Sequence, residues 1–175
     1  MNTTRRKFIY STMAAAGTAA LFPQMSFGRV TPEFVRDQID QEIVKEYVLV
    51  AHKDFDRMKT LLEEYPNLLN ATIDWGDGDF ESAIGAAGHM GHKDYANYLI
   101  DNGARFDIFV LTMLGKTEIV IPIIESYPQL VNSIGPHGFT LLHHAEKGKE
   151  DAKELYDYFE SKGLTEKFIK TFDKD

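Results

Sequence analysis

Residues 62–70 read LEEYPNLLN, and residues 124–132 read IESYPQLVN, 62 positions further along the chain. The two stretches share an aliphatic residue, a Glu, a Tyr-Pro pair, a Leu and a final Asn at matching positions. Because proline disfavours the α conformation in the residue before it, we expect one helix to end at Tyr65 and another at Tyr127. The duplication predicts a structural unit that the chain uses at least twice.

Apolar residues at helical spacing precede the first copy, where Met58, Leu61 and Leu62 fall on one face. The same spacing recurs at Tyr95 and Leu99. A helix of about ten residues is marginal in water and has to bury its apolar stripe against neighbours. The pattern therefore predicts a stack of short helix pairs.

Residues 138–145 read GFTLLHHA, and residues 87–104 read AGHMGHKDYANYLIDNGA. These segments resemble the ankyrin repeat, whose pattern is Gly-x-Thr-Pro-Leu-His-x-Ala-Ala, two spacers, Gly-His, and a helix that closes on Gly-Ala. Leu141 replaces the Pro of this pattern, and Gly85 stands where it has His. The matching residues are Gly138, Thr140, Leu142, His143 and Ala145 in the last unit, and Ala87, Gly91, His92, Leu99, Gly103 and Ala104 in the central unit.

The resemblance covers about residues 42–164 and implies an all-α ankyrin-repeat solenoid of about four imperfect helix-turn-helix units. Residues 42–70 and 106–132 keep only the second helix of the pattern. The turn positions Gly91 and Gly115 lie 24 residues apart, against a usual repeat of about 33. This short spacing implies that one hairpin of the ankyrin pattern is missing between the two turns.

Polar segments flank the predicted repeats. Thr31-Pro32-Glu33 is typical of a helix start, with an N-cap, a first-turn proline and an acid near the positive end of the helix. The tail from Asp151 to Asp175 is similarly charged. Terminal repeats need a polar outer face, so we expect capping helices at both ends of a domain that spans residues 29–175.

The charges are unevenly distributed along the chain. It has 27 acidic and 19 basic residues, and residues 1–28 hold three of the basic residues and no carboxylate. The remainder carries 16 basic against 27 acidic residues, a net charge of −11. A surface this acidic repels phosphate backbones and anionic lipids, which argues against nucleic-acid or membrane-surface binding. The absence of cysteine excludes disulfides and thiolate metal sites.

The first 28 residues are typical of a signal peptide. A basic cluster precedes a short apolar run from Phe8 to Phe22, which is too short and too rich in Gly and Thr for a stable membrane anchor. The sequence TRRKFI at residues 4–9 resembles the twin-arginine (Tat) export motif, in which Arg5 and Arg6 would be read by the Tat translocase. The resemblance implies bacterial export to the periplasm or medium, and we expect cleavage after Gly28.

Six histidines raise the question of a metal site. A transition-metal site needs three or four converging ligands, and no acidic residue lies at helical spacing from two of the paired histidines. The ankyrin resemblance instead gives His92 and His143 structural roles. Residues 74–81 alternate carboxylates and glycines like a calcium loop, but Gly85 occupies the position of the required bidentate Glu. We therefore expect a flexible hairpin tip, and neither a metal nor a cofactor.

The sequence offers little catalytic apparatus, because no nucleophile elbow, Walker loop or dinucleotide motif occurs. A binding role has better support, because Trp75 and Phe80 lie among acids and glycines, where aromatic anchors suit protein recognition. Alternatively, Trp75 packs back between repeats, and Phe109 and Met113 belong to the core. The expected contact residues are Trp75, Asp77, Asp79, Phe80, His89, Phe109, Met113, His137 and Phe139.

The sequence thus predicts an exported, non-catalytic ankyrin-repeat module, monomeric by default, that mediates binding to another protein. Two alternatives stay open. One is a periplasmic protein that binds a small molecule or a cation through the Asp-Gly-rich tip, and the other is an accessory subunit of an exported enzyme.

Overall fold

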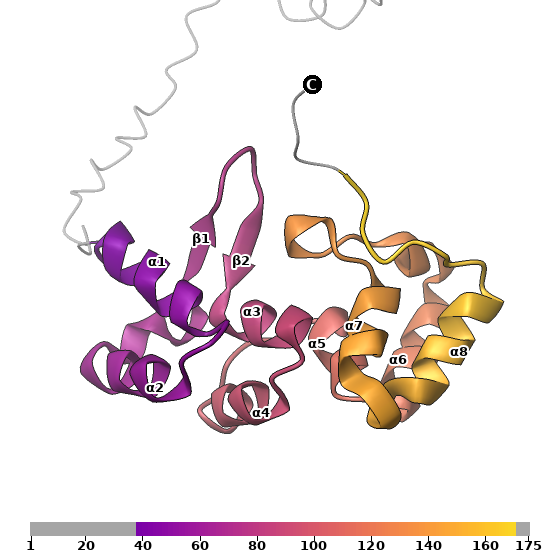
Figure 1. The fold of residues 1–175 in the computed structure, drawn as a ribbon, viewed down its shortest axis with the longest axis horizontal. Helices are drawn as coiled ribbons and strands as arrows, with labels where there is room; N and C mark the ends of the chain where they lie inside the picture. The colour runs from indigo at the N-terminus through magenta and orange to yellow at the C-terminus, as the bar shows by residue number, and fades with distance from the viewer. Residues whose placement is uncertain (1–37, 171–175) are drawn as a thin grey trace, which may run out of the picture. The chain divides into compact units, whose positions relative to one another are not determined.

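The computed structural model describes residues 38–170. The predicted signal peptide with Arg5 and Arg6, most of the predicted N-terminal cap and the last five residues lie outside this range. Within it the chain is mostly helical and has one small antiparallel hairpin, in which β1 (Thr72–Asp74) pairs with β2 (Phe80–Ser82) (Figure 1). The α-helices are α1 (Gln41–Val50), α2 (Phe55–Glu64), α3 (Ala83–Met90), α4 (Lys93–Asp101), α5 (Ile108–Met113), α6 (Thr117–Ser126), α7 (Leu141–Gly148) and α8 (Lys153–Ser161).

The two copies of the repeated stretch adopt the same local structure. Tyr65 and Tyr127 lie at the ends of α2 and α6, with nearly identical backbone angles of φ −128°, ψ 79° and φ −134°, ψ 72°. Each is followed by a 3-10 turn that begins at the proline, η1 (Pro66–Asn70) and η2 (Pro128–Asn132). The predicted helix ends are confirmed.

Short polar side chains fix most helix starts. Asp54 accepts a hydrogen bond from the backbone N–H of Arg57 at the start of α2, and Ser82 accepts one from Gly85 at the start of α3. Asp107 accepts two at the start of α5. Such caps satisfy amide groups that have no partner inside the helix, which makes short helices possible in this chain.

The helices pack as consecutive pairs: α1 with α2, α3 with α4, α5 with α6, and α7 with α8. Their first members also contact one another in sequence, α1 with α3, α3 with α5, and α5 with α7 (Figure 1). Between α4 and α5 the chain forms no hairpin, as the short repeat step predicts. The predicted all-α class agrees with a domain that is mostly helical, and the β1–β2 hairpin is a departure from it.

Two apolar clusters form the core. The first includes Tyr47, Met58 and Leu99, and the second includes Leu142 and Phe159. Two of the expected contact residues lie here: Met113 is fully buried and Phe109 is 9% exposed. Both therefore belong to the core, which is the alternative that the sequence left open for them. None of the helices in the described range is long and apolar enough to span a bilayer.

The C-terminal tail returns across the domain as a strap, defined here as residues 165–170 (Figure 1, yellow). The N–H of Thr140 donates to the carbonyl of Lys167, and its hydroxyl donates to the carbonyl of Glu166. The N–H of Ile169 donates to Gly138. The strap thereby fixes residues 138–140, which begin at the last residue of the 3-10 turn η3 (Pro136–Gly138).

Buried His144 makes the stability of the domain depend on pH. Its ring is 1% exposed and bonds the carbonyl of Thr140 through Nδ1, and burial lowers its pKa to about 3. In the unfolded chain this histidine has its ordinary pKa of 6.5. Between about pH 3 and pH 6.5 the unfolded chain therefore binds one proton more than the folded chain. The contribution of neutral His144 to the free energy of unfolding is complete above pH 6.5. It is lost as the pH falls from 6.5 to about 3.

We expect metal-free protein to lose about 1.4 kcal/mol of unfolding free energy per pH unit below pH 6.5 through this residue. Urea denaturation at pH 7.0, 6.0 and 5.0 in the presence of a chelator measures the slope. A His144→Gln variant serves as the comparison and should show a shallower slope. Equal slopes for the two proteins would contradict the assignment.

Candidate metal centre

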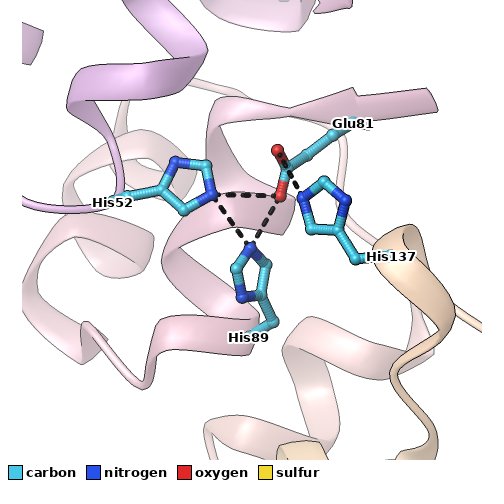
Figure 2. Close-up of side chains that lie close together, drawn as sticks. All are labelled: His52, Glu81, His89 and His137. Atoms are coloured by element: carbon cyan, nitrogen blue, oxygen red, sulfur yellow. Dashed lines mark hydrogen bonds and ion pairs between the residues drawn. The ribbon is translucent and has the colours of Figure 1, made fainter. Parts of the chain in front are cut away.

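Four side chains that are distant in the sequence converge in space: His52, Glu81, His89 and His137 (Figure 2). One ligand atom from each lies within 4.8 Å of the others. His52 lies in the turn after α1, Glu81 in β2, His89 in α3 and His137 in the turn η3. The described residues contain no other group of this kind.

The separations of the ligand atoms suit coordination of a single ion. His89 Nε2 lies 2.7 Å from Glu81 Oε1 and 3.1 Å from His52 Nε2. His52 Nε2 lies 3.5 Å from the same carboxylate oxygen, and His137 Nε2 lies 3.3 Å from Glu81 Oε2. Ligands about 2.0–2.1 Å from a tetrahedral ion are about 3.3 Å apart. The three separations of 3.1–3.5 Å are close to this value, and the 2.7 Å contact is a hydrogen bond that would lengthen when an ion binds.

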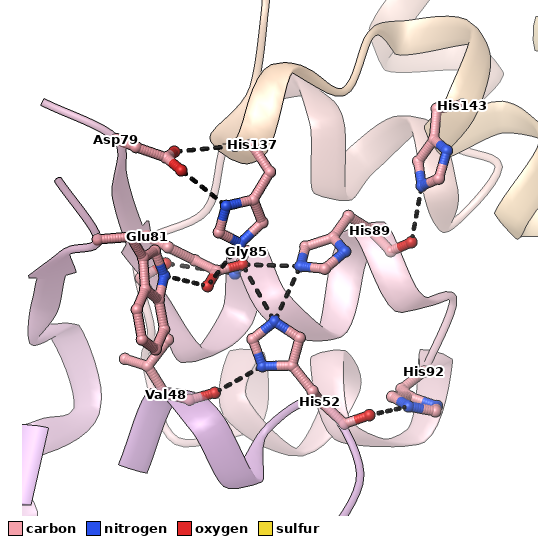
Figure 3. A network of polar contacts seen from close by, with 11 residues as sticks. Val48, His52, Asp79, Glu81, Gly85, His89, His92, His137 and His143 are labelled. Atoms are coloured by element: carbon pink, nitrogen blue, oxygen red, sulfur yellow. Dashed lines mark hydrogen bonds and ion pairs between the residues drawn. The ribbon is translucent and has the colours of Figure 1, made fainter. Parts of the chain in front are cut away.

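The end of α1 orients His52. Its Nδ1 bonds the carbonyl of Val48, one turn back in the helix, at 3.0 Å, which turns Nε2 toward Glu81 (Figure 3). The backbone is also held, because His92 Nε2 donates to the carbonyl of His52 at 2.8 Å. A hydrogen bond from the remote ring nitrogen to a carbonyl is the usual support of a metal-binding histidine.

Asp79 holds His137 through both its backbone and its ring. The N–H of His137 donates to Asp79 Oδ1 at 2.8 Å, and Nδ1 bonds Asp79 Oδ2 at 2.7 Å (Figure 3). His137 has a φ of 59°, in the left-handed region that costs a residue with a side chain about 1 kcal/mol and costs glycine almost nothing. A histidine at this position indicates a role for its side chain.

Glu81 is fully buried and ionised. Burial on its own would raise its pKa, but the hydrogen bonds from His52 and His89 outweigh this effect and leave the pKa below its usual range. The indole N–H of Trp75 donates to Oε2 at 2.7 Å, which leaves Oε1 facing the two histidines. A buried carboxylate is costly unless hydrogen bonds and positive charge compensate it, and a bound cation would supply that charge here.

His89 is the most deeply buried of the three ring ligands. Burial lowers its pKa despite the bond to Glu81, which favours the neutral imidazole that a metal ligand has to present. His143 Nε2 donates to the carbonyl of His89 at 2.9 Å, and the ring of Phe139 stacks on His89 with centroids 5.2 Å apart. His92 and His143 thus have the structural roles that the resemblance implies, but each bonds the backbone of an earlier helix pair and not that of its own turn.

The ligand set of three imidazoles and one carboxylate determines which ions fit. Ca²⁺ and Mg²⁺ prefer oxygen ligands alone, whereas imidazole nitrogens suit Zn²⁺, Cu²⁺, Ni²⁺ and Fe²⁺. With three imidazoles and one carboxylate as ligands, Zn²⁺ suits this set best.

The structure gathers five of the nine predicted contact residues at this centre: His89 and His137 as ligand positions, and Trp75, Asp79 and Phe139 in support. Trp75 thus packs back onto the domain, the alternative that the sequence left open. Phe80 points elsewhere and is 61% exposed, and Asp77 lies at the hairpin tip. Asp74 Oδ1 accepts from Gly76 and Gly78, which gives the calcium-like segment an ordinary turn role.

Sequence reasoning missed His52 and Glu81 and expected no metal. The four positions come from four separate elements, so helical spacing could not reveal them. One signal was present: His52 and His89 lie 37 residues apart, close to one repeat, at the ends of the first helices of successive pairs.

Comparison of the sequence with models of known protein families gives no match, and comparison with curated proteins gives none either. Fold and site therefore define the protein only as a mostly helical domain that carries a His₃Glu cluster.

Replacement of Asp79 by Asn tests the support of His137. The amide keeps the size of the side chain but offers the ring an uncharged partner, so we expect Zn²⁺ affinity to fall about tenfold with the fold retained. Competition titration against a chromogenic chelator measures the affinity. Asp101→Asn, at an exposed position of α4, is the control and should bind as the wild type does. Equal affinity for Asp79→Asn and wild type would contradict the role of Asp79.

Proposed function

We propose that this protein binds a transition-metal ion, Zn²⁺ in the first place, through His52, Glu81, His89 and His137. The convergence of four ligand atoms within 4.8 Å carries the proposal. Hydrogen bonds on the far sides of His52, His137 and Glu81 support it, because they turn the ligand atoms inward before any ion arrives.

The scaffold of this centre is, in our proposal, an ankyrin-type stack exported by the Tat route. Helix pairs in series, the repeated Tyr-Pro unit and the short loop between α4 and α5 support the ankyrin assignment. The Arg5-Arg6 motif supports the export assignment. This proposal corresponds to the cation-binding periplasmic protein that the sequence left open as an alternative. The proposed ion differs in position, because it lies at the base of the hairpin and not at its Asp-Gly-rich tip.

A zinc titration of the chelator-treated full chain tests the proposal, with elemental analysis after desalting. We expect one ion per chain in the wild type. His89→Ala and Glu81→Gln should reduce affinity at least about 1,000-fold, because each removes a buried ligand. His92→Gln, which keeps a donor for the carbonyl of His52, is the matched control and should bind one ion. A wild-type protein without a stoichiometric ion, or unchanged binding in both ligand variants, would overturn the proposal.

A second candidate function, binding to another protein, rests on exposed aromatic residues near the hairpin. Two clefts of about 350–360 Å³ share Thr72, Ser82, Gly85 and Asp107 in their walls. Phe106, 47% exposed, lines one cleft, and Phe80 lines the other. Solvent-exposed phenylalanines beside clefts are suitable anchors for a partner chain.

Affinity capture from the bacterial envelope with wild type and a Phe80→Ala/Phe106→Ala variant tests this second function. We expect a specific partner to be lost from the variant while one zinc ion per chain and the helical circular dichroism are retained. An identical set of captured proteins would contradict the role of these residues.

A further inference from the structure

The four ligand positions are not equivalent in geometry. His52 Nε2, His89 Nε2 and Glu81 Oε1 form a compact triangle with sides of 3.1, 2.7 and 3.5 Å. The contact of His137 is with the other carboxylate oxygen, Oε2, at 3.3 Å (Figure 2). Three ligand atoms thus face one point together, and His137 approaches it from a separate side.

Burial differs among the four positions, and His137 is the most exposed of them. The side chains of Glu81 and His89 are buried, at 0% and 5% exposed, whereas those of His52 and His137 are partly exposed, at 19% and 30%. An ion held by His52, Glu81 and His89 would therefore be most open to solvent at the position that His137 occupies.

The supporting elements differ as well. The other three ligand positions lie in α3, in β2 and in the turn directly after α1, and α3 packs against both α1 and β2. His137 lies instead in a short turn where it and Gly138 both have positive φ, 59° and 85°. Its position is set by the bonds to Asp79 and to the strap, and not by packing within the helix pairs that hold the other three ligands.

We propose that the centre is a three-plus-one site, in which His52, Glu81 and His89 hold the ion and His137 is a displaceable fourth ligand. Displacement of His137 opens one coordination position to an external monodentate donor. This inference rests on the proposed metal binding. Metal sites that exchange ligands commonly keep three protein ligands and one open position.

Charge defines the class of external ligand. A divalent ion with one carboxylate and two neutral imidazoles keeps a net charge of +1, which favours a small anion over a cation or a neutral donor. The opening corresponds to one imidazole, so the ligand is small and binds through one nitrogen or oxygen. Azide and imidazole are suitable probes of this position.

A His137→Gly variant tests the inference, because glycine suits the left-handed backbone and leaves a space the size of an imidazole. With Co²⁺ in place of Zn²⁺ in the full chain, visible absorption reports coordination. We expect His137→Gly to bind Co²⁺ with affinity reduced about 10- to 100-fold. Added imidazole should restore the wild-type spectrum. In the wild type, azide should change the spectrum in a saturable way.

His89→Ala is the comparison and should neither bind Co²⁺ tightly nor recover with imidazole. If His137→Gly loses Co²⁺ as completely as His89→Ala, the four ligands are equivalent and the inference fails, while the proposed metal binding stands. Unchanged affinity in His137→Gly, or no response to imidazole, also overturns it. Absence of Co²⁺ and Zn²⁺ from the wild type removes both proposals together.

Discussion

Saturating Zn²⁺ should raise the melting temperature of the chelator-treated protein by about 12–16 °C. An ion that binds only the folded state stabilises it by about 4 kcal/mol at a concentration 1,000 times its dissociation constant. For a domain of this size, 1 kcal/mol corresponds to about 3–4 °C. The effect is large because His52, Glu81, His89 and His137 are brought together only by folding. Differential scanning calorimetry of the full chain, with and without Zn²⁺, measures the shift.

Glu81→Gln should abolish this shift. The amide oxygen can still accept the hydrogen bond from Trp75, so the variant loses the charged ligand with little change in packing. Glu125→Gln, at an exposed position of α6, changes the net charge equally and should keep the full shift. A shift that survives in Glu81→Gln, or that disappears in Glu125→Gln, would place the stabilising ion somewhere else.

Gly148→Ala should lower the free energy of unfolding by about 2–3 kcal/mol. In an open helix this change is favourable by about 1 kcal/mol. At the end of α7, however, the added Cβ would lie 2.4 Å from the carbonyl oxygen of Met113 and 2.4 Å from the Cβ of Ala152. Neither atom belongs to a flexible side chain, so the backbone of α5 or of the turn after α7 has to move, and this overpacking outweighs the gain.

Gly85→Ala is the matched control, because Gly85 is also a helical glycine. Its added Cβ would meet nothing closer than Ser82 Oγ at 3.4 Å, an ordinary contact. We expect unchanged stability or a gain of up to about 1 kcal/mol. Urea denaturation of both variants measures the difference, and an equal change in the two would mean that helix propensity, not close packing, decides the outcome at Gly148.

Local chemistry made much of the fold predictable. Tyr-Pro fixes the ends of α2 and α6, because proline acts on the residue next to it. The apolar stripe of Met58 and Leu61 predicts the buried face of α2, because helical spacing is a short-range property. How Trp75 would pack was not predictable, because its partner Glu81 depends on the pairing of β1 with β2.

The centre was predictable only in fragments. His89 and His137 were expected to serve function, but as contacts for a partner, because each is isolated in its own segment. Glu81 looked like one acid among many in an acidic hairpin, and His52 had no motif around it. A metal-ligand set that is spread over 86 positions of the chain, from residue 52 to residue 137, becomes visible only when the elements are placed in space.

The strap determines when this centre can be completed during synthesis. A nascent chain leaves the ribosome N-terminus first, so His52, Glu81 and His89 are available early. The backbone bonds that hold residues 138–140 come from Glu166, Lys167 and Ile169, which are made after all four ligand residues. The turn that carries His137 is therefore fixed only after residues 166–169 have been made. His52, Glu81 and His89 can be brought together before the fourth ligand position is complete.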